Sequence, residues 1–133
     1  MKTFDVQSIG INKSAAEVYE FLAQPQNLTK WTNAFERADA ETADLVTPNG
    51  AVPIKLNTVA NTAAGSVDWY MTFPDGSVGT AFSRVTPDGD DKSIYSFVLM
   101  APPVPLEALE GALQAQMGIL AQELVELKTM MEA

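Results

Sequence analysis

The chain has 133 residues, with 8 Lys and Arg against 17 Asp and Glu, so its formal net charge is −9. It contains no cysteine and no histidine, which excludes disulfide scaffolds, thiolate metal sites and Ser-His or Cys-His nucleophile pairs. The few basic residues are scattered singly, which argues against nucleic acid as a partner. We expect one globular domain spanning residues 1–133, without a metal or cofactor.

The sequence predicts neither a secretion signal nor a membrane span. The first residues alternate in polarity and lack the apolar run of a signal peptide. The longest apolar stretch, Phe97 to Val104, is interrupted by Pro102 and Pro103 and falls short of the ~20 residues needed to cross a bilayer. We therefore expect a soluble, cytoplasmic protein, and we leave open whether it forms a homodimer.

The N-terminal part of the chain predicts a strand followed by two short helices. Residues 3–11 alternate between apolar and polar, which is typical of a strand. Ser14 followed by Glu17 forms a capping box that predicts the start of a helix, and Pro25 ends this helix. A second helix is predicted over 26–34, where apolar side chains recur at spacings of three and four.

From residue 36 to residue 100 the pattern changes to strands separated by turns. Turn signals that contain Pro, Asn, Asp and Gly recur along this stretch, and little helical periodicity is left. The order predicts an antiparallel meander of roughly six strands. The clearest strands cover 66–73, 78–86 and 93–100, and two or three others lie near 37–42, 44–47 and 52–62.

A long amphipathic helix is predicted after the prolines that follow the last strand. Glu and Gln occupy one of its faces. A coiled coil is disfavoured because residues 112–121 are rich in Ala, Gly and Met, so we expect the helix to pack on the sheet. Its apolar face consists of Leu106, Leu109, Leu113, Met117, Leu120, Leu124, Leu127 and Met131.

These elements together predict an α+β helix-grip fold. A sheet of this length must twist and curl, and a helix of ~26 residues, about 39 Å long, can lie across its concave face. We expect a curved antiparallel sheet of about six to seven strands around the long C-terminal helix, with two short helices after the first strand. Such an arrangement leaves a cavity that apolar side chains line from both sides.

The same order of elements and several short motifs resemble a known superfamily. Residues 14–22 (Ser-Ala-Ala-Glu-Val-Tyr-Glu-Phe-Leu) and 25–31 (Pro-Gln-Asn-Leu-Thr-Lys-Trp) are similar to the opening of the polyketide cyclase and lipid-transport superfamily (SRPBCC), which includes START domains and the birch pollen allergen. Residues 124–128 resemble the end of that family's long helix. The resemblance implies a helix-grip fold with an internal hydrophobic pocket, but no single activity. Catalytic members typically place histidines or acid/base residues in the cavity, and this chain has no histidine.

The predicted ligand-lining residues come from three strands and the long helix. In the strand 66–73 we assign the face of Trp69 to the interior, and we extend the alternation to the next two strands. Aromatic and Met side chains with a few polar atoms are typical of ligand sites. The alternative for each of them, as for Trp31, is an ordinary place in the core. The predicted ligand-binding residues are Trp69, Met71, Thr80, Phe82, Arg84, Tyr95, Phe97, Leu113, Met117 and Leu120.

Polar residues lead to three further hypotheses. Arg84 at the mouth of an apolar pocket would bind a ligand carboxylate in bidentate fashion, the alternative being a solvated strand residue. Asp68 with Tyr70 or Tyr95 would form an acid/base pair, although the alternation puts Asp68 on the outward face. The acidic run 88–91 lacks the spacing of a calcium loop and is interpreted as a hairpin turn. No catalytic residue is assigned.

The sequence favours a protein that binds a small hydrophobic or amphipathic molecule between the sheet and the C-terminal helix. Arg84, Tyr95 or Thr80 would orient this ligand. Two other classes stay open: a cyclase or hydrolase that acts on an aromatic polyketide-like substrate in the same cavity, and a ligand-free module that docks on a protein partner through the long helix or a sheet edge. A fully packed interior would favour the last of these.

Overall fold

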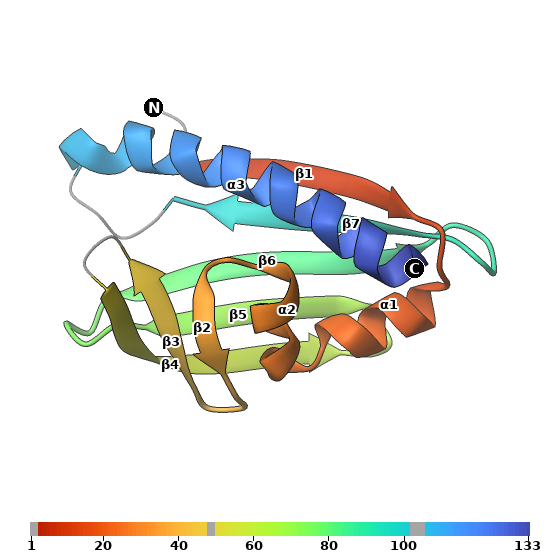
Figure 1. Ribbon diagram of the computed structural model, residues 1–133, viewed down its shortest axis with the longest axis horizontal. Helices are drawn as coiled ribbons and strands as arrows, with labels where there is room; N and C mark the ends of the chain where they lie inside the picture. Colours follow the sequence, from red (N-terminus) through yellow and green to blue (C-terminus); the bar gives the residue numbers. More distant parts are fainter. Residues whose placement is uncertain (1–2, 48–49, 102–105) are drawn as a thin grey trace.

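The computed structural model describes residues 3–47, 50–101 and 106–133, which form a curved antiparallel sheet with helices on one side (Figure 1). The predicted α+β helix-grip class is confirmed, with seven strands in the order β1-β7-β6-β5-β4-β3-β2. The strands are β1 (Phe4–Ile11), β2 (Phe35–Ala38), β3 (Thr42–Thr47), β4 (Gly50–Asn61), β5 (Ser66–Thr72), β6 (Val78–Pro87) and β7 (Ser93–Met100). The helices are α1 (Ala15–Leu22), the 3-10 turn η1 (Pro25–Asn27), α2 (Leu28–Trp31) and α3 (Leu106–Glu132).

Helix α1 begins at the predicted capping box. The Ser14 hydroxyl accepts a hydrogen bond from the Glu17 amide at 3.3 Å and donates to the Glu17 carboxylate at 3.2 Å. These bonds satisfy an amide that the first helical turn leaves free. The helix ends before Pro25, and its apolar side buries Val18 and Leu22 against the sheet.

Helix α2 is shorter than the helix predicted over 26–34. The 3-10 turn is followed by only four helical residues, Leu28–Trp31. Thr32 ends the helix because its backbone is extended, with φ −114° and ψ 155°. Its amide and its hydroxyl both donate to the Leu28 carbonyl, at 3.0 and 2.6 Å. The hydroxyl thus takes up a carbonyl lone pair at the helix end.

An aspartate closes the β2–β3 hairpin. The Asp39 carboxylate accepts hydrogen bonds from the amides of Glu41 and Thr42 at 2.9 and 2.8 Å. These bonds lower the pKa of Asp39 to about 2. The turn ends β2 at Ala38, so the single strand predicted over 37–42 is divided between β2 and the start of β3.

Strand β4 connects two parts of the sheet. Its second half pairs with β5, from Lys55 opposite Thr72 to Asn61 opposite Ser66. Its first half, beginning at Gly50, pairs with β3 alone. Where β5 ends, the first half of β4 continues with β3 and β2, and these strands curl across in front of the rest of the sheet (Figure 1). We call this place the fork of the sheet. This curl gives the sheet the concave side that the helices cover.

Helix α3 is fastened on both sides of the concave surface. The Lys128 ammonium donates to the Gly10 carbonyl at the end of β1, at 2.8 Å. On the other side the buried Glu123 carboxylate accepts a hydrogen bond from the Asn33 amide, just after α2, at 2.6 Å. Burial raises the pKa of Glu123, and the Asn33 amide opposes this rise. A carboxylate with one amide partner is therefore part of the helix–sheet junction.

The raised pKa of Glu123 predicts a pH-dependent stability. The folded protein holds this proton more tightly than the unfolded chain, so Glu123 costs stability as the pH rises from about 4.5 through its folded pKa. Glu123→Gln keeps an acceptor for the Asn33 amide. The free energy of unfolding of this variant, relative to that of the wild type, should increase between pH 4.5 and pH 7.5. Urea unfolding at several pH values measures the gain. Glu20→Gln, which removes the same charge at an exposed position of α1, should show no comparable gain, and an equal gain in both variants would contradict the account.

Candidate functional site

Small residues lie along the middle of the inner face, the side of the sheet that carries the helices. On β6 three successive inward positions, ahead of Val85, are Gly79, Ala81 and Ser83. Their neighbours are large, since Ala81 is opposite Trp69 on β5 and Ser83 is opposite Phe97 on β7. The small side chains of β6 leave room that aromatic rings from both sides occupy.

Four aromatic residues form what we call the aromatic cluster: Trp31, Trp69, Tyr95 and Phe97. Trp69 and Phe97 stack across β6 with ring centroids 6.1 Å apart and an interplanar angle of 25°. Trp31 reaches in from α2 and meets Tyr95 and Phe97 edge-on at 6.1 and 6.5 Å. All four side chains are buried. Rings in such arrangements add about 0.5–1.5 kcal/mol per pair beyond their burial, so the cluster is a rigid wall.

Several polar atoms beside these rings are buried without hydrogen bonds to the described part of the chain. They include the indole nitrogens of Trp31 and Trp69 and the hydroxyls of Thr58 and Ser93. Thr58 lies directly opposite Trp69 in the β4–β5 register. An indole N–H can only donate, and a buried donor without an acceptor costs about 1–3 kcal/mol. The Tyr95 hydroxyl is likewise buried without a partner among the described residues, so the cluster offers three unused donors, two of them indoles.

The phenol of Tyr95 is a neutral member of this cluster. Burial raises the pKa of Tyr95 above its ordinary value, and the neighbouring Ser83 hydroxyl opposes the rise. Ser83 itself donates to the Val67 carbonyl at 2.6 Å. Tyr95 is therefore protonated at neutral pH, which suits it to donate a hydrogen bond but not to act as a base.

Burial decreases along the inner face from one end to the other. Near α1, Ile11 and Leu127 are almost completely buried. Toward the opposite ends of β5 and β7, the apolar side chains of Met71 and Leu99 are only half-buried, and so is Met117 on α3. Apolar groups of this kind are normally buried in a closed core. The inner face is therefore sealed at the α1 end and partly accessible at the other, around Met71, Leu99 and Met117, although Asp5 and Leu113 at that end are buried.

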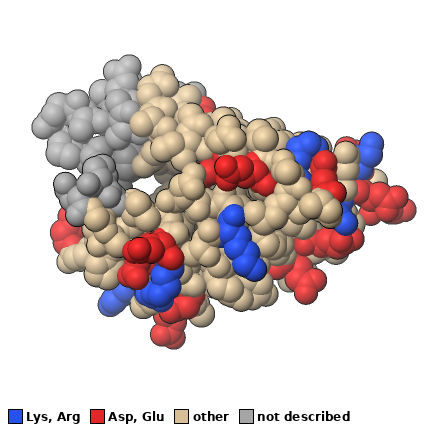
Figure 2. All heavy atoms as spheres, viewed as in Figure 1, with Lys and Arg blue, Asp and Glu red and all other residues tan. Residues whose placement is uncertain are grey.

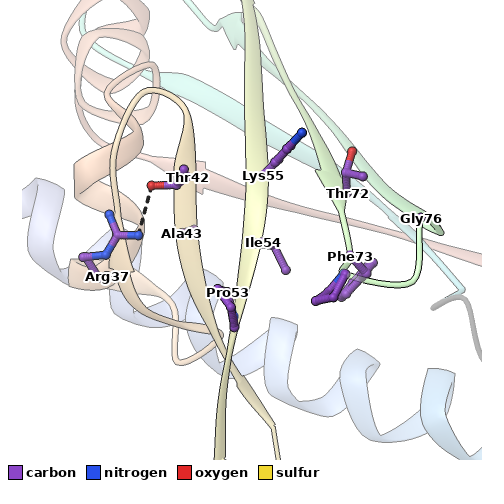
Figure 3. Close-up of a pocket in the computed structure, with 10 residues that line it drawn as sticks. Arg37, Thr42, Ala43, Pro53, Ile54, Lys55, Thr72, Phe73 and Gly76 are labelled. Atoms are coloured by element: carbon purple, nitrogen blue, oxygen red, sulfur yellow. Dashed lines mark hydrogen bonds between the residues drawn. The ribbon is translucent and has the colours of Figure 1, made fainter.

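An open pocket of about 600 Å³ lies at the fork of the sheet (Figure 3). Ile54 and Phe73 belong to its wall, and both project toward the side on which α3 lies, whereas Lys55 projects the opposite way (Figure 3). Ala43 contributes a small apolar surface beside them. Since Ile54 is in the core and Phe73 packs against it, the pocket reaches the inner face from the edge of the molecule.

One of the two cations that line this pocket, Arg37, already has its charge balanced. Arg37 donates to the Thr42 hydroxyl at 3.0 Å and makes ion pairs with Asp39 and Asp44 at 2.7 and 3.1 Å. The two carboxylates raise the pKa of Arg37 further. Arg37 is therefore a structural cation of the β2–β3 hairpin rather than an anion receptor.

Comparisons with known proteins show the fold. No family model matches the chain, and no curated protein matches its sequence. A START superfamily protein from Mycobacterium smegmatis superposes with a TM-score of 0.67 at 11% identity, over 92% of this chain and 94% of that one. The Zhui aromatase/cyclase from a Streptomyces species gives 0.67 at 8%, over 96% and 90%. The di-domain aromatase/cyclase BexL gives 0.74 at 15%, over 97% of this chain and 46% of that one. The chain has the fold of the START and aromatase/cyclase proteins.

The resemblance stated from the sequence motifs is thus confirmed at the level of the fold. A shared fold does not by itself imply a shared function. The identities are too low to carry a ligand or a reaction from one chain to another. The present chain spans about half the length of BexL, which has two domains.

Seven of the ten predicted ligand residues lie on the inner side of this START-like fold. Trp69, Tyr95, Phe97 and Leu120 belong to the buried core, and Met71 packs against it. Leu113 is buried on the same face of α3, and Met117 lies half-buried between Leu113 and Leu120 along the helix. The structure brings these residues together, and their role in binding stays a prediction.

The other three, Thr80, Phe82 and Arg84, lie on the opposite, outer face of the sheet. Directly paired residues share a face, and Trp69 is paired with Ala81, so the neighbours of Ala81 on β6 point outward. The expected facing of β6 was therefore wrong by one residue. Arg84 is exposed, and its Nε donates to the Ala64 carbonyl at 2.9 Å.

The facing of the strands also bears on the hypothesis of an acid/base pair. Asp68 is paired with Phe82 and lies on the outer face, as the alternation predicted. Tyr70 shares that face, where its ring meets Phe82 edge-on at 6.0 Å. Tyr95 lies on the inner face, so the sheet separates it from Asp68. The structure therefore does not bring the Asp68 carboxylate and the Tyr95 hydroxyl together as a pair.

Sequence reasoning missed the polar residues of the inner face. Thr58, Ser83 and Ser93 are small and hydrophilic, and nothing in their spacing distinguishes them from solvated strand residues. One usable signal was the series Gly79, Ala81, Ser83, since three small residues at alternate positions indicate the side of a strand that large neighbours cover.

Among the residues whose side chains the structure describes, no three acidic residues gather closely enough to hold a metal ion. In the same part of the chain, no helix combines the length and the apolar character that a membrane span requires.

The facing of β6 predicts the effects of two leucine substitutions. Ala81→Leu adds atoms between Trp69 and Phe97, so it should reduce the free energy of unfolding by about 1–3 kcal/mol. Thr80→Leu, one residue away on the outer face, should change it by less than about 0.5 kcal/mol. Urea unfolding at pH 7 measures both, and a larger loss for Thr80→Leu would mean that the faces are reversed.

Proposed function

We propose that this protein binds one small amphipathic molecule, largely apolar and carrying a hydrogen-bond acceptor, between the inner face of the sheet and α3. The observation that carries the proposal is the pair of buried indole N–H groups of Trp31 and Trp69 that have no acceptor in the described part of the chain. A carbonyl, ether or carboxylate oxygen placed among the rings would satisfy a donor that otherwise costs stability.

Apolar burial would supply most of the affinity. Removing apolar surface from water contributes roughly 25 cal/mol per Å², and the half-buried side chains of Met71, Leu99 and Met117 provide surface at the accessible end of the inner face. The ligand would enter there, beside the pocket at the fork of the sheet. The indole donors would then fix its orientation, and the protein would act by sequestering or carrying the molecule.

Ligand binding is better supported than catalysis. Tyr95 is held protonated by burial, and Asp68 lies on the other side of the sheet. General acid–base catalysis needs a group whose pKa lies near the working pH and within reach of the substrate. The solved START and aromatase/cyclase structures share the fold of this chain, and this likeness supports an interior binding space without naming a ligand.

A ligand-free interaction module is the third class. It would need an interior closed at both ends, as in an ordinary core. The half-burial of Met71 and Leu99 on the inner face supports binding over this alternative.

The proposal is tested with the fluorescent probe 8-anilinonaphthalene-1-sulfonate, which has fused rings and acceptor oxygens. Wild-type protein should bind it with one site per chain. Met117→Trp should weaken binding at least tenfold, because the larger ring fills the accessible end of the inner face. Ile119→Trp is the matched control, since Ile119 is half-exposed on the solvent side of the same helix, and it should leave binding unchanged.

Circular dichroism and urea unfolding verify that both variants fold. Equal loss of binding in both variants, or unchanged binding in Met117→Trp, would contradict an inner-face site. Val6→Glu, on the outer face, separates binding at that surface from binding inside, because only surface binding would be lost.

A further inference from the structure

The outer face of the sheet carries a continuous apolar surface. In the register, Val6 on β1 lies beside Val98 on β7, and Val98 lies beside Phe82 on β6. A second row begins with Phe4 beside Met100. Phe4 and Val6, on the edge strand β1, are 47% and 55% exposed. We call the surface formed by Phe4, Val6, Tyr70, Phe82, Val98 and Met100 the outer patch.

Charge is depleted around the outer patch. Among the outward positions of β1, β7 and β6, all within the described residues, Arg84 alone is charged. The chain as a whole carries −9, and carboxylates are spread over the face that bears α2, α3 and β2 (Figure 2). A surface that is apolar and poor in charge within a strongly acidic molecule has the composition of an interface centre.

We propose that the outer patch is the contact surface of a homodimer, with a second copy of this chain stacked face to face on the sheet. Two copies carrying −9 repel one another wherever carboxylates meet. The outer patch is a face on which they can approach without opposing like charges. A charged partner would find Arg84 and Asp68 to contact beside the outer patch, and the opposite charges of these two residues cancel.

The dimensions fit a pair of stacked sheets. Four neighbouring strands, β1, β7, β6 and β5, spaced about 4.8 Å apart and each contributing about seven residues of 3.3 Å, cover a face of roughly 19 by 23 Å. A two-fold dimer of standard size buries ~800 Å² per partner, which such a face and its flanking side chains can supply. Packed sheets in β-sandwiches lie about 10 Å apart and interdigitate side chains of this size.

The experiment measures self-association by sedimentation velocity over a wide range of protein concentration. Wild-type protein should form a dimer, and the dimer should tighten as sodium chloride rises from 20 to 300 mM, because salt screens the repulsion between the acidic chains. Val6→Glu should weaken the dimer at least tenfold by placing like charges face to face. Val125→Glu is the matched control: it adds the same charge at a comparably exposed valine of α3, and it should leave the dimer intact.

Phe82→Glu distinguishes stacking from pairing of the β1 edges, since β6 is separated from that edge by β7. Stacking requires that Phe82→Glu also dissociate the dimer, with circular dichroism verifying that the variant folds. A monomeric wild type at every concentration and salt would overturn the proposal and leave the patch to another partner. So would a dimer that Val125→Glu disrupts and Val6→Glu does not, or one that Phe82→Glu leaves intact.

Discussion

The pairing of Ala81 with Trp69 across β5 and β6 is the constraint on which both faces of the sheet depend. Directly opposite residues share a face, so this pair puts the small residues of β6 under the aromatic rings and turns Phe82 outward. A slip of one residue would exchange the two sets and would bury Phe82 where Trp69 and Phe97 now stack. The aromatic cluster inside and the apolar patch outside are thus two consequences of one register.

Local patterns predicted the elements that depend on near neighbours in the chain. The capping box at Ser14 and the spacing of apolar residues along α3 act within one or two turns, and the structure has both. The extent of α2 depends on a competing bond, because the Thr32 hydroxyl binds the Leu28 carbonyl and the backbone becomes extended there. Periodicity alone contains no information about that competition.

The candidate site was predictable only where one face of a strand is clearly more apolar than the other. On β5 the alternation around Trp69 indicated the inner face correctly. On β6 the alternation failed because the outer face of the sheet is itself apolar. The large apolar side chain of Phe82 therefore indicated the wrong face, and Arg84, two residues further along the strand, was assigned to that face with it. The buried hydroxyl of Thr58 was out of reach for another reason, since its surroundings are set by strands and helices distant in sequence.

Native mass spectrometry of the folded protein tests the central claim, that a small molecule occupies the space between sheet and α3. Wild-type protein and Met117→Trp would each be incubated with an organic extract of the cells that produce the protein, and the bound mass would then be released by denaturation. The account predicts one added molecule per wild-type chain and none on Met117→Trp. No adduct on the wild type, or the same adduct on both proteins, would contradict it.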